Sequence, residues 1–176
     1  MKTISLIILS IFFSSCIGNN NEIDSNLNSQ SILNSKNVSA RIKTIHGDII
    51  FKFHEKDAPN TSKRIQELIS NGFYNGLTFH RAIPNFVVQG GDPKGNGTGG
   101  SGKNIAAEIN THKHIPGTVA MARARNLNSA DSQFYISLGT HPHLDNKYTI
   151  FGHVVSGLDN ANKIQVGDKM ISVTLE

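Results

Sequence analysis

Short apolar-rich runs separated by turn residues occupy the chain from about residue 40 to its C-terminus, and the first of them alternate between apolar and polar residues. This period of two is typical of β-strands that turn one face toward a core. Residues 40–53 hold two such runs around His46-Gly47-Asp48, and this arrangement predicts a β-hairpin. Six further strands are predicted over residues 77–83, 86–92, 117–122, 132–138, 148–155 and 170–176.

One segment between these runs has the punctuation of a helix instead. Residues 59–61 (Pro-Asn-Thr) suit a first helical turn, and Asn71-Gly72 suits a C-terminal stop. The apolar face of this helix is predicted to consist of Ile65, Leu68 and Ile69. A second, short helix is predicted over residues 158–164. Many short strands with one or two helices favour a closed antiparallel β-barrel, because closure removes exposed strand edges.

The first fifteen residues have a different pattern, in which Lys2 precedes a predominantly apolar run over residues 4–13. This is the layout of a secretory signal peptide, and the run is shorter than the ~20 residues of a membrane-spanning helix. Ser14 and Ser15 before Cys16 resemble a bacterial lipobox, in which the cysteine thiol is acylated. We therefore expect a signal peptide over residues 1–15 and a lipid on Cys16. The alternatives are an ordinary cleaved signal and a cytosolic N-terminus with an incidental cysteine.

Residues 16–39 contain no sustained apolar period, and more than half of residues 17–39 are Asn or Ser. Such a composition buries too little surface to offset the entropy of ordering, so it predicts a flexible tether. The folded domain is then expected to span residues 40–176. With a lipid on Cys16, this organisation predicts an extracytoplasmic, membrane-anchored protein of the periplasm or cell envelope, which we expect to be monomeric.

Composition excludes several classes of function. The formal net charge of +4 comes without a dense Lys/Arg block, so no nucleic-acid partner is expected. The single cysteine excludes an internal disulfide and a multi-cysteine metal site. His112 and His114, and likewise His141 and His143, are spaced i, i+2, but no acidic residue or cysteine completes a ligand set at a familiar spacing. We therefore expect surface histidines and no metal.

The glycine-rich loop over residues 95–104 offers two weak nucleotide motifs. Gly95, Gly97 and Gly100 satisfy G-x-G-x-x-G, but the surrounding pattern is antiparallel rather than β-α-β. A near match to a P-loop has Asn104 where Ser or Thr would be needed to bind magnesium. The loop is therefore predicted to be a tight turn with unusual φ angles, and no cofactor is expected.

A hydrolase would need a nucleophile, a base and an orienting acid. Asp131-Ser132 and the scattered histidines supply these residue types, but no recognisable signature such as G-x-S-x-G is present. Another residue attracts attention instead. Arg81 lies within the apolar stretch "FHRAIPNFVVQGGDP" (residues 79–93), where a buried guanidinium would be costly without a partner. It is either a paired structural charge or a group directed into an apolar groove.

That stretch closely resembles the signature of the cyclophilin peptidyl-prolyl cis-trans isomerases. The motifs "GNGTGG", "GTVAMARA", "DSQFYISL" and "HLDNKYTIFGHV" follow in the order of the family, and the likeness runs from about Ala40 to the C-terminus. The resemblance implies an eight-stranded antiparallel β-barrel flanked by two α-helices. It also implies catalysis of rotation about X-Pro peptide bonds, without a cofactor, in proline-containing polypeptides.

The resemblance also assigns roles by position. Arg81 falls on the catalytic arginine of the family, and Gln89 on the glutamine that accompanies it. The remaining matches fall on substrate-binding positions, namely Phe86, Val87, Ala122, Arg123, Ala124, Gln133, Tyr135, His143, Leu144 and Tyr148. His143 and Tyr148 stand where many eukaryotic members have tryptophan and histidine, so tight inhibition by cyclosporin is not expected. The alternative function is a non-catalytic proline-binding chaperone or adhesion module that uses the same groove.

Overall fold

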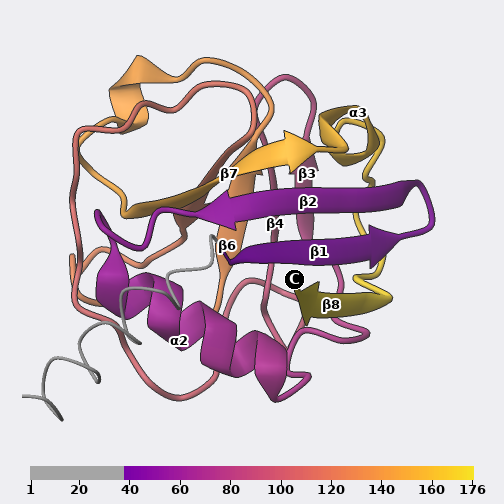
Figure 1. Cartoon of the computed structure of the whole chain (residues 1–176), viewed down its shortest axis with the longest axis horizontal. Helices are drawn as coiled ribbons and strands as arrows, with labels where there is room; N and C mark the ends of the chain where they lie inside the picture. The colour runs from indigo at the N-terminus through magenta and orange to yellow at the C-terminus, as the bar shows by residue number, and fades with distance from the viewer. Residues whose placement is uncertain (1–37) are drawn as a thin grey trace, which may run out of the picture. The chain divides into compact units, whose positions relative to one another are not determined.

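The computed structural model describes residues 38–176; the predicted signal peptide, lipidated Cys16 and nearly all of the predicted tether lie outside these residues. All eight predicted strands are found close to their expected positions. Their bounds are β1 Ser39–Thr44, β2 Gly47–Phe53, β3 Arg81–Ile83, β4 Val87–Gly90, β5 Thr118–Met121, β6 Phe134–Ser137, β7 Ile150–Ser156 and β8 Ser172–Leu175. The prediction of a mainly β domain is therefore confirmed (Figure 1).

The strands form one antiparallel sheet in the order β3-β4-β6-β5-β7-β2-β1-β8. The expectation of a closed barrel is wrong, since β3 and β8 end this order and no ladder joins them. An isolated bridge between Thr78 and Lys169 links the segments that precede these two strands, supported by the main-chain hydrogen bond from Phe79 N to Asp168 O at 2.8 Å. The sheet is thus a half-barrel whose edges meet outside the regular strands.

Alternation along the strands gives the sheet two buried sides. Val88, Val119 and Ile136 point into the main core, which also contains Phe51, Phe79 and Phe151. Their neighbours Val87, Ala120 and Tyr135 point to the other side, where they form a smaller cluster with Ile150. Because successive side chains of a strand face opposite ways, the same strands that build the core also present a second apolar surface.

The helix α2, Pro59–Ser70, covers the main core (Figure 1). Its buried apolar residues are Ile65, Leu68 and Ile69, as the sequence predicts. Asn71 is its C-cap, and Gly72 follows with φ of +68°. At the other end, the Glu108 carboxylate accepts the main-chain N–H groups of Asn60 and Thr61 at 2.9 and 2.8 Å. A distant loop therefore caps this helix.

Two shorter helical segments complete the described part of the chain. The helix α3, Leu158–Ala161, is the second predicted helix and is shorter than expected. The 3-10 turn η1, Pro142–Leu144, has no counterpart in the sequence-based prediction. Among residues 38–176, no helix combines the length and the apolar character needed to cross a bilayer.

Candidate active site

A cavity of about 280 Å³ opens over the second apolar surface of the sheet. It is lined by Arg81, Phe86, Val87, Gln89, Ala122, Arg123, Tyr135, Leu144 and Tyr148. All nine belong to the site predicted from the sequence. Two other predicted residues, Ala124 and Gln133, line an adjoining hollow beside the glycine-rich loop, which the cavity meets at Ala122 and Arg123.

The register of the sheet aligns the polar end of the cavity with its floor. Arg81 is paired with Gln89 across β3 and β4, and Gln89 is paired with Tyr135 across β4 and β6. Tyr135 is in turn paired with Ala120 on β5. Residues directly opposite each other in an antiparallel sheet project from the same face. The four side chains therefore form one row across four strands.

The Arg81 side chain is exposed at the cavity. Its guanidinium is therefore not buried and does not need a partner of opposite charge. Its Nη1 donates to Gln89 Oε1 at 3.4 Å, and its guanidinium carbon lies 5.4 Å from the centroid of the Phe86 ring. Within residues 38–176, no carboxylate forms an ion pair with Arg81. The guanidinium keeps donor capacity for a ligand in the cavity.

A chain of amides holds Gln89 in place. Its Nε2 donates to Gln133 Oε1 at 3.0 Å. The Gln133 amide in turn donates to the main-chain carbonyls of Gly97 and Gly99, at 3.1 and 2.8 Å. The glycine-rich loop therefore fixes Gln133, Gln133 fixes Gln89, and Gln89 orients Arg81. This chain connects Gln133 to the cavity-lining Gln89, although Gln133 itself does not line the main cavity.

The apolar part of the cavity is formed by closely packed side chains. Val87 and Tyr135 are almost fully buried in its floor, and the Phe86 ring forms one wall. His143 does not line the cavity, but its ring stacks on that of Phe86, with centroids 6.1 Å apart and planes 14° apart. The Phe86 carbonyl also accepts the N–H of Leu138 at 2.8 Å. Contacts with His143 and Leu138 therefore hold Phe86 in place.

Sequence reasoning missed a buried polar chain beneath this floor. The Tyr135 hydroxyl lies 2.8 Å from His114 Nε2, and His114 Nδ1 lies 3.1 Å from Asp145 Oδ1. A carboxylate only accepts, so Nδ1 carries the proton and Nε2 accepts from Tyr135. Burial lowers the pKa of His114 despite Asp145, and burial raises the pKa of Tyr135, so both side chains are neutral. The expectation of surface histidines is therefore wrong for His114, which is buried, and its i, i+2 spacing from His112 was the only sequence signal for it.

Arg123 closes one rim of the cavity. Its Nη2 and Nε donate to the Lys147 carbonyl at 2.9 and 3.2 Å, and its guanidinium carbon lies 4.9 Å from the centroid of the Tyr148 ring. The Arg123 guanidinium thus makes contacts within the protein, and these contacts connect the segment after β5 to the turn before β7. The rim is held by side-chain contacts as well as by the main chain.

The glycine-rich loop has its amide groups occupied by carboxylates of the protein itself. Main-chain N–H groups of Lys94, Asn96 and Gly97 donate to Asp92, and those of Ser101 and Gly102 donate to Asp131. Left-handed φ angles at Gly95, Gly97 and Gly102, from +66° to +87°, confirm the predicted unusual turn. A phosphate would have to compete with these internal anions, as expected for a loop that is not a nucleotide site.

The Asp131-Ser132 pair is structural. Ser132 is fully buried, and its hydroxyl donates to the Gly91 carbonyl at 2.7 Å. Asp131 is directed at the glycine-rich loop instead of at a histidine. No hydrolytic arrangement is formed by these two residues.

Comparison with known proteins agrees with this site. The family described as "Cyclophilin type peptidyl-prolyl cis-trans isomerase/CLD" matches residues 39–174. A peptidyl-prolyl cis-trans isomerase of Synechococcus elongatus is 44% identical over 140 residues, covering 78% of this chain and 96% of the relative. Peptidyl-prolyl cis-trans isomerase B of Bacillus subtilis is 45% identical over 130 residues, covering 73% of this chain and 90% of the relative.

Solved structures agree as well. A Cryptosporidium parvum cyclophilin-type isomerase superposes with a TM-score of 0.74 at 28% identity, covering 78% of this chain and 96% of that chain. The same protein has been crystallised in the presence of the dipeptide Ala-Pro. Sequence motifs, strand order and cavity therefore lead to one conclusion: the chain belongs to the cyclophilin-type peptidyl-prolyl cis-trans isomerases.

Proposed function

We propose that this isomerase acts on extracytoplasmic polypeptides and that Arg81 stabilises the twisted X-Pro bond. The observation that carries the mechanism is the Arg81 guanidinium, which lies without a carboxylate partner among residues 38–176 at the edge of an apolar cavity. Arg81 is exposed and is held by an amide and an aromatic face, so its remaining N–H donors can bond to a ligand in the cavity.

The chemistry needs no bond to break. A peptide bond resists rotation by roughly 18–20 kcal/mol because the nitrogen lone pair is shared with the carbonyl. At mid-twist this sharing is lost and the prolyl nitrogen becomes a hydrogen-bond acceptor. A fixed guanidinium donor beside that nitrogen binds the twisted state better than either planar state, and this difference accelerates the reaction.

The other residues that line the cavity would bind the proline ring. The proline ring would occupy the apolar socket formed by Phe86, Tyr135 and Leu144, while the preceding carbonyl swings. Gln89 would keep the Arg81 donor oriented through its link to Gln133. The Ala-Pro dipeptide used with the Cryptosporidium parvum relative is a ligand of the size that this socket would accept.

A non-catalytic proline-binding module is the alternative function. It would need the apolar socket but not the oriented donor. The full chain should accelerate the cis-to-trans conversion of a short X-Pro peptide above its thermal rate. Exchange spectroscopy measures this rate. Saturable binding of the same peptide with a rate equal to the thermal one would support the alternative and refute catalysis.

The proposed location rests on the N-terminal sequence alone. An apolar leader followed by Cys16 and an Asn/Ser-rich tether would anchor the domain at a membrane surface in the cell envelope. Mass spectrometry of the protein isolated from its native cells should find acyl chains on an N-terminal Cys16. A mature chain with an unmodified Cys16 would refute the anchor.

A further inference from the structure

Three potential metal ligands from distant parts of the sequence meet away from the proline cavity. They are His54, Asp57 and His112, and their donor atoms all lie within 4.8 Å of one another. His112 Nε2 lies 2.9 Å from Asp57 Oδ2, and the rings of His54 and His112 stack with centroids 4.1 Å apart. None of the three lines the proline cavity. The two histidines of the i, i+2 pair therefore have different environments. His114 contacts Tyr135 beneath the cavity floor, whereas His112 belongs to this cluster.

Both segments that carry the cluster are fixed by main-chain contacts. His54 N donates to the Phe151 carbonyl at 2.8 Å, so the end of β2 stays attached to β7. The Asp57 and Ala58 N–H groups both donate to the His54 carbonyl, at 3.1 and 2.9 Å. A tight turn thus brings His54 and Asp57 close together.

The loop that carries His112 is held against that turn. Glu108 caps α2 directly after the turn, and Asn110 Nδ2 donates to the Ile150 carbonyl at 2.8 Å. His112 follows two residues later. The three ligands are therefore presented by a loop and a turn that are both held by hydrogen bonds, with their donor atoms within 4.8 Å of one another.

A shallow hollow beside the cluster contains a further imidazole. His54, His112 and His153 line it together with Lys113. The Lys113 ammonium would repel a cation, but it is 3.4 Å from the Asp145 carboxylate, which offsets its charge. Lys56 is the other cationic side chain adjacent in sequence, and it is exposed to solvent. The hollow leaves an open side through which water could complete a coordination shell.

We infer that His54, Asp57 and His112 form a binding site for a borderline divalent cation of the Zn²⁺ class. Two imidazoles and one carboxylate, with water in the fourth position, are a familiar donor set for zinc, at about 2.0–2.2 Å from each ligand. Nitrogen donors favour Zn²⁺ and its transition-metal neighbours over Mg²⁺ or Ca²⁺. This site is independent of the proposed isomerase mechanism.

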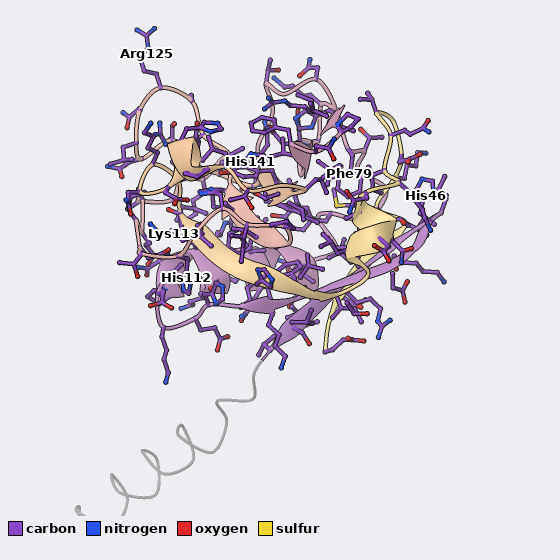
Figure 2. All side chains as sticks on the ribbon, turned by 90° about the horizontal axis from the view of Figure 1, so that it is seen from above. His46, Phe79, His112, Lys113, Arg125 and His141 are labelled. Carbon is purple, nitrogen blue, oxygen red and sulfur yellow. The ribbon has the colours of Figure 1, made fainter. Side chains whose placement is uncertain are left out.

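The same chain offers a matched comparison. His46 Nε2 lies 2.8 Å from Asp168 Oδ2, which is again a partly exposed His–Asp pair. No third ligand accompanies this pair in the part of the chain that the structure describes. Figure 2 shows His46 at the opposite end of the domain from His112. If a His–Asp pair alone were enough, both places would bind the metal equally.

Isothermal titration with ZnCl₂ tests the site on the full chain in a Cys16→Ser background, which removes the single thiol as a competing ligand. The background protein should bind one Zn²⁺ per chain. His112→Ala and Asp57→Asn should each weaken binding by about 100-fold or more, because loss of even an outer-shell partner costs about 10–100-fold. His46→Ala should leave the affinity unchanged.

Isomerase activity of each variant serves as the check that it folds. Three results would overturn the inference. They are absence of saturable binding in the background protein, unchanged affinity in a folded His112→Ala variant, and an equal loss of affinity in His46→Ala.

Discussion

The Tyr135 hydroxyl and His114 Nε2 lie 2.8 Å apart beneath the floor of the proline cavity. Asp145 fixes the other ring nitrogen, so the imidazole has one tautomer and one orientation. The aromatic face that lines the cavity is therefore held by a polar group on its buried side. This contact links the cavity to the segment before β5, in addition to the ring contacts of His114 with Tyr135 and Tyr148.

Removing this hydroxyl should destabilise the fold without removing the aromatic ring. Tyr135→Phe leaves a buried acceptor on His114 without its donor, which costs about 1–3 kcal/mol of unfolding free energy. Urea denaturation measures this loss. Tyr148→Phe is the matched control, because among residues 38–176 no hydrogen bond is made by the Tyr148 hydroxyl. Equal stability of the wild type and Tyr135→Phe would contradict the role of the contact.

The buried carboxylate of Asp92 should make the glycine-rich loop sensitive to acid. Burial alone would raise the pKa of Asp92, but donation from main-chain N–H groups, Lys94 and Gly97 first among them, holds that pKa below its ordinary value. A lowered folded pKa gives stability that is present above the unfolded value of about 3.9 and is lost as pH falls through the folded pKa.

Asp92→Asn should therefore lower the free energy of unfolding by about 2 kcal/mol at pH 7, the range for hydrogen bonds to charged groups. The difference from wild type should shrink as pH falls below about 4, because the unfolded wild-type chain then binds a proton at Asp92 and the folded chain does so only at its lower pKa. Denaturation at several pH values measures it. Asp159→Asn, at an exposed carboxylate, is the control. A difference that is constant between pH 7 and pH 3 would contradict the assignment.

Local signals in the sequence were sufficient to locate the eight strands and two α-helices of residues 38–176, but not the 3-10 turn η1. Alternation located the β1–β2 hairpin, and short runs between turn residues located the other six strands. The residues at both ends of α2 marked its limits, because these preferences depend on neighbours in the chain. The closure of the barrel was predicted wrongly. Whether β3 and β8 pair depends on contacts between segments some ninety residues apart, which no local pattern encodes.

The sequence likewise predicted the residues of the site but not the contacts between them. Family motifs located all nine cavity-lining residues. The contacts that orient them were not predicted, because they join separate segments: Gln133 to the glycine-rich loop, His114 to Tyr135, and Arg123 to the Lys147 carbonyl. The cluster of His54, Asp57 and His112 was missed for the same reason. Spacing along the sequence can reveal metal ligands that share one element, but it cannot reveal ligands that two separate segments bring together.

The rim contact of Arg123 should affect substrate binding more than turnover. Arg123→Ala removes a cation–π contact with Tyr148 and the bonds to the Lys147 carbonyl, so the rim loosens. An exposed cation–π contact contributes about 0.5–1 kcal/mol, so KM should rise by about two- to fivefold with kcat unchanged. Steady-state kinetics with an X-Pro peptide separates the two constants. A fall in kcat at constant KM would place Arg123 in the transition state instead.

The central claim concerns the donor at Arg81, and the kcat/KM of Arg81→Ala tests it most directly. The matched control is Arg125→Ala, since Figure 2 shows Arg125 projecting outward from a loop and it does not line the cavity. We expect Arg81→Ala to lose about 100-fold or more, as enzymes do when one preorganised donor is removed, and Arg125→Ala to match wild type. A folded Arg81→Ala variant with wild-type kcat/KM would contradict the mechanism.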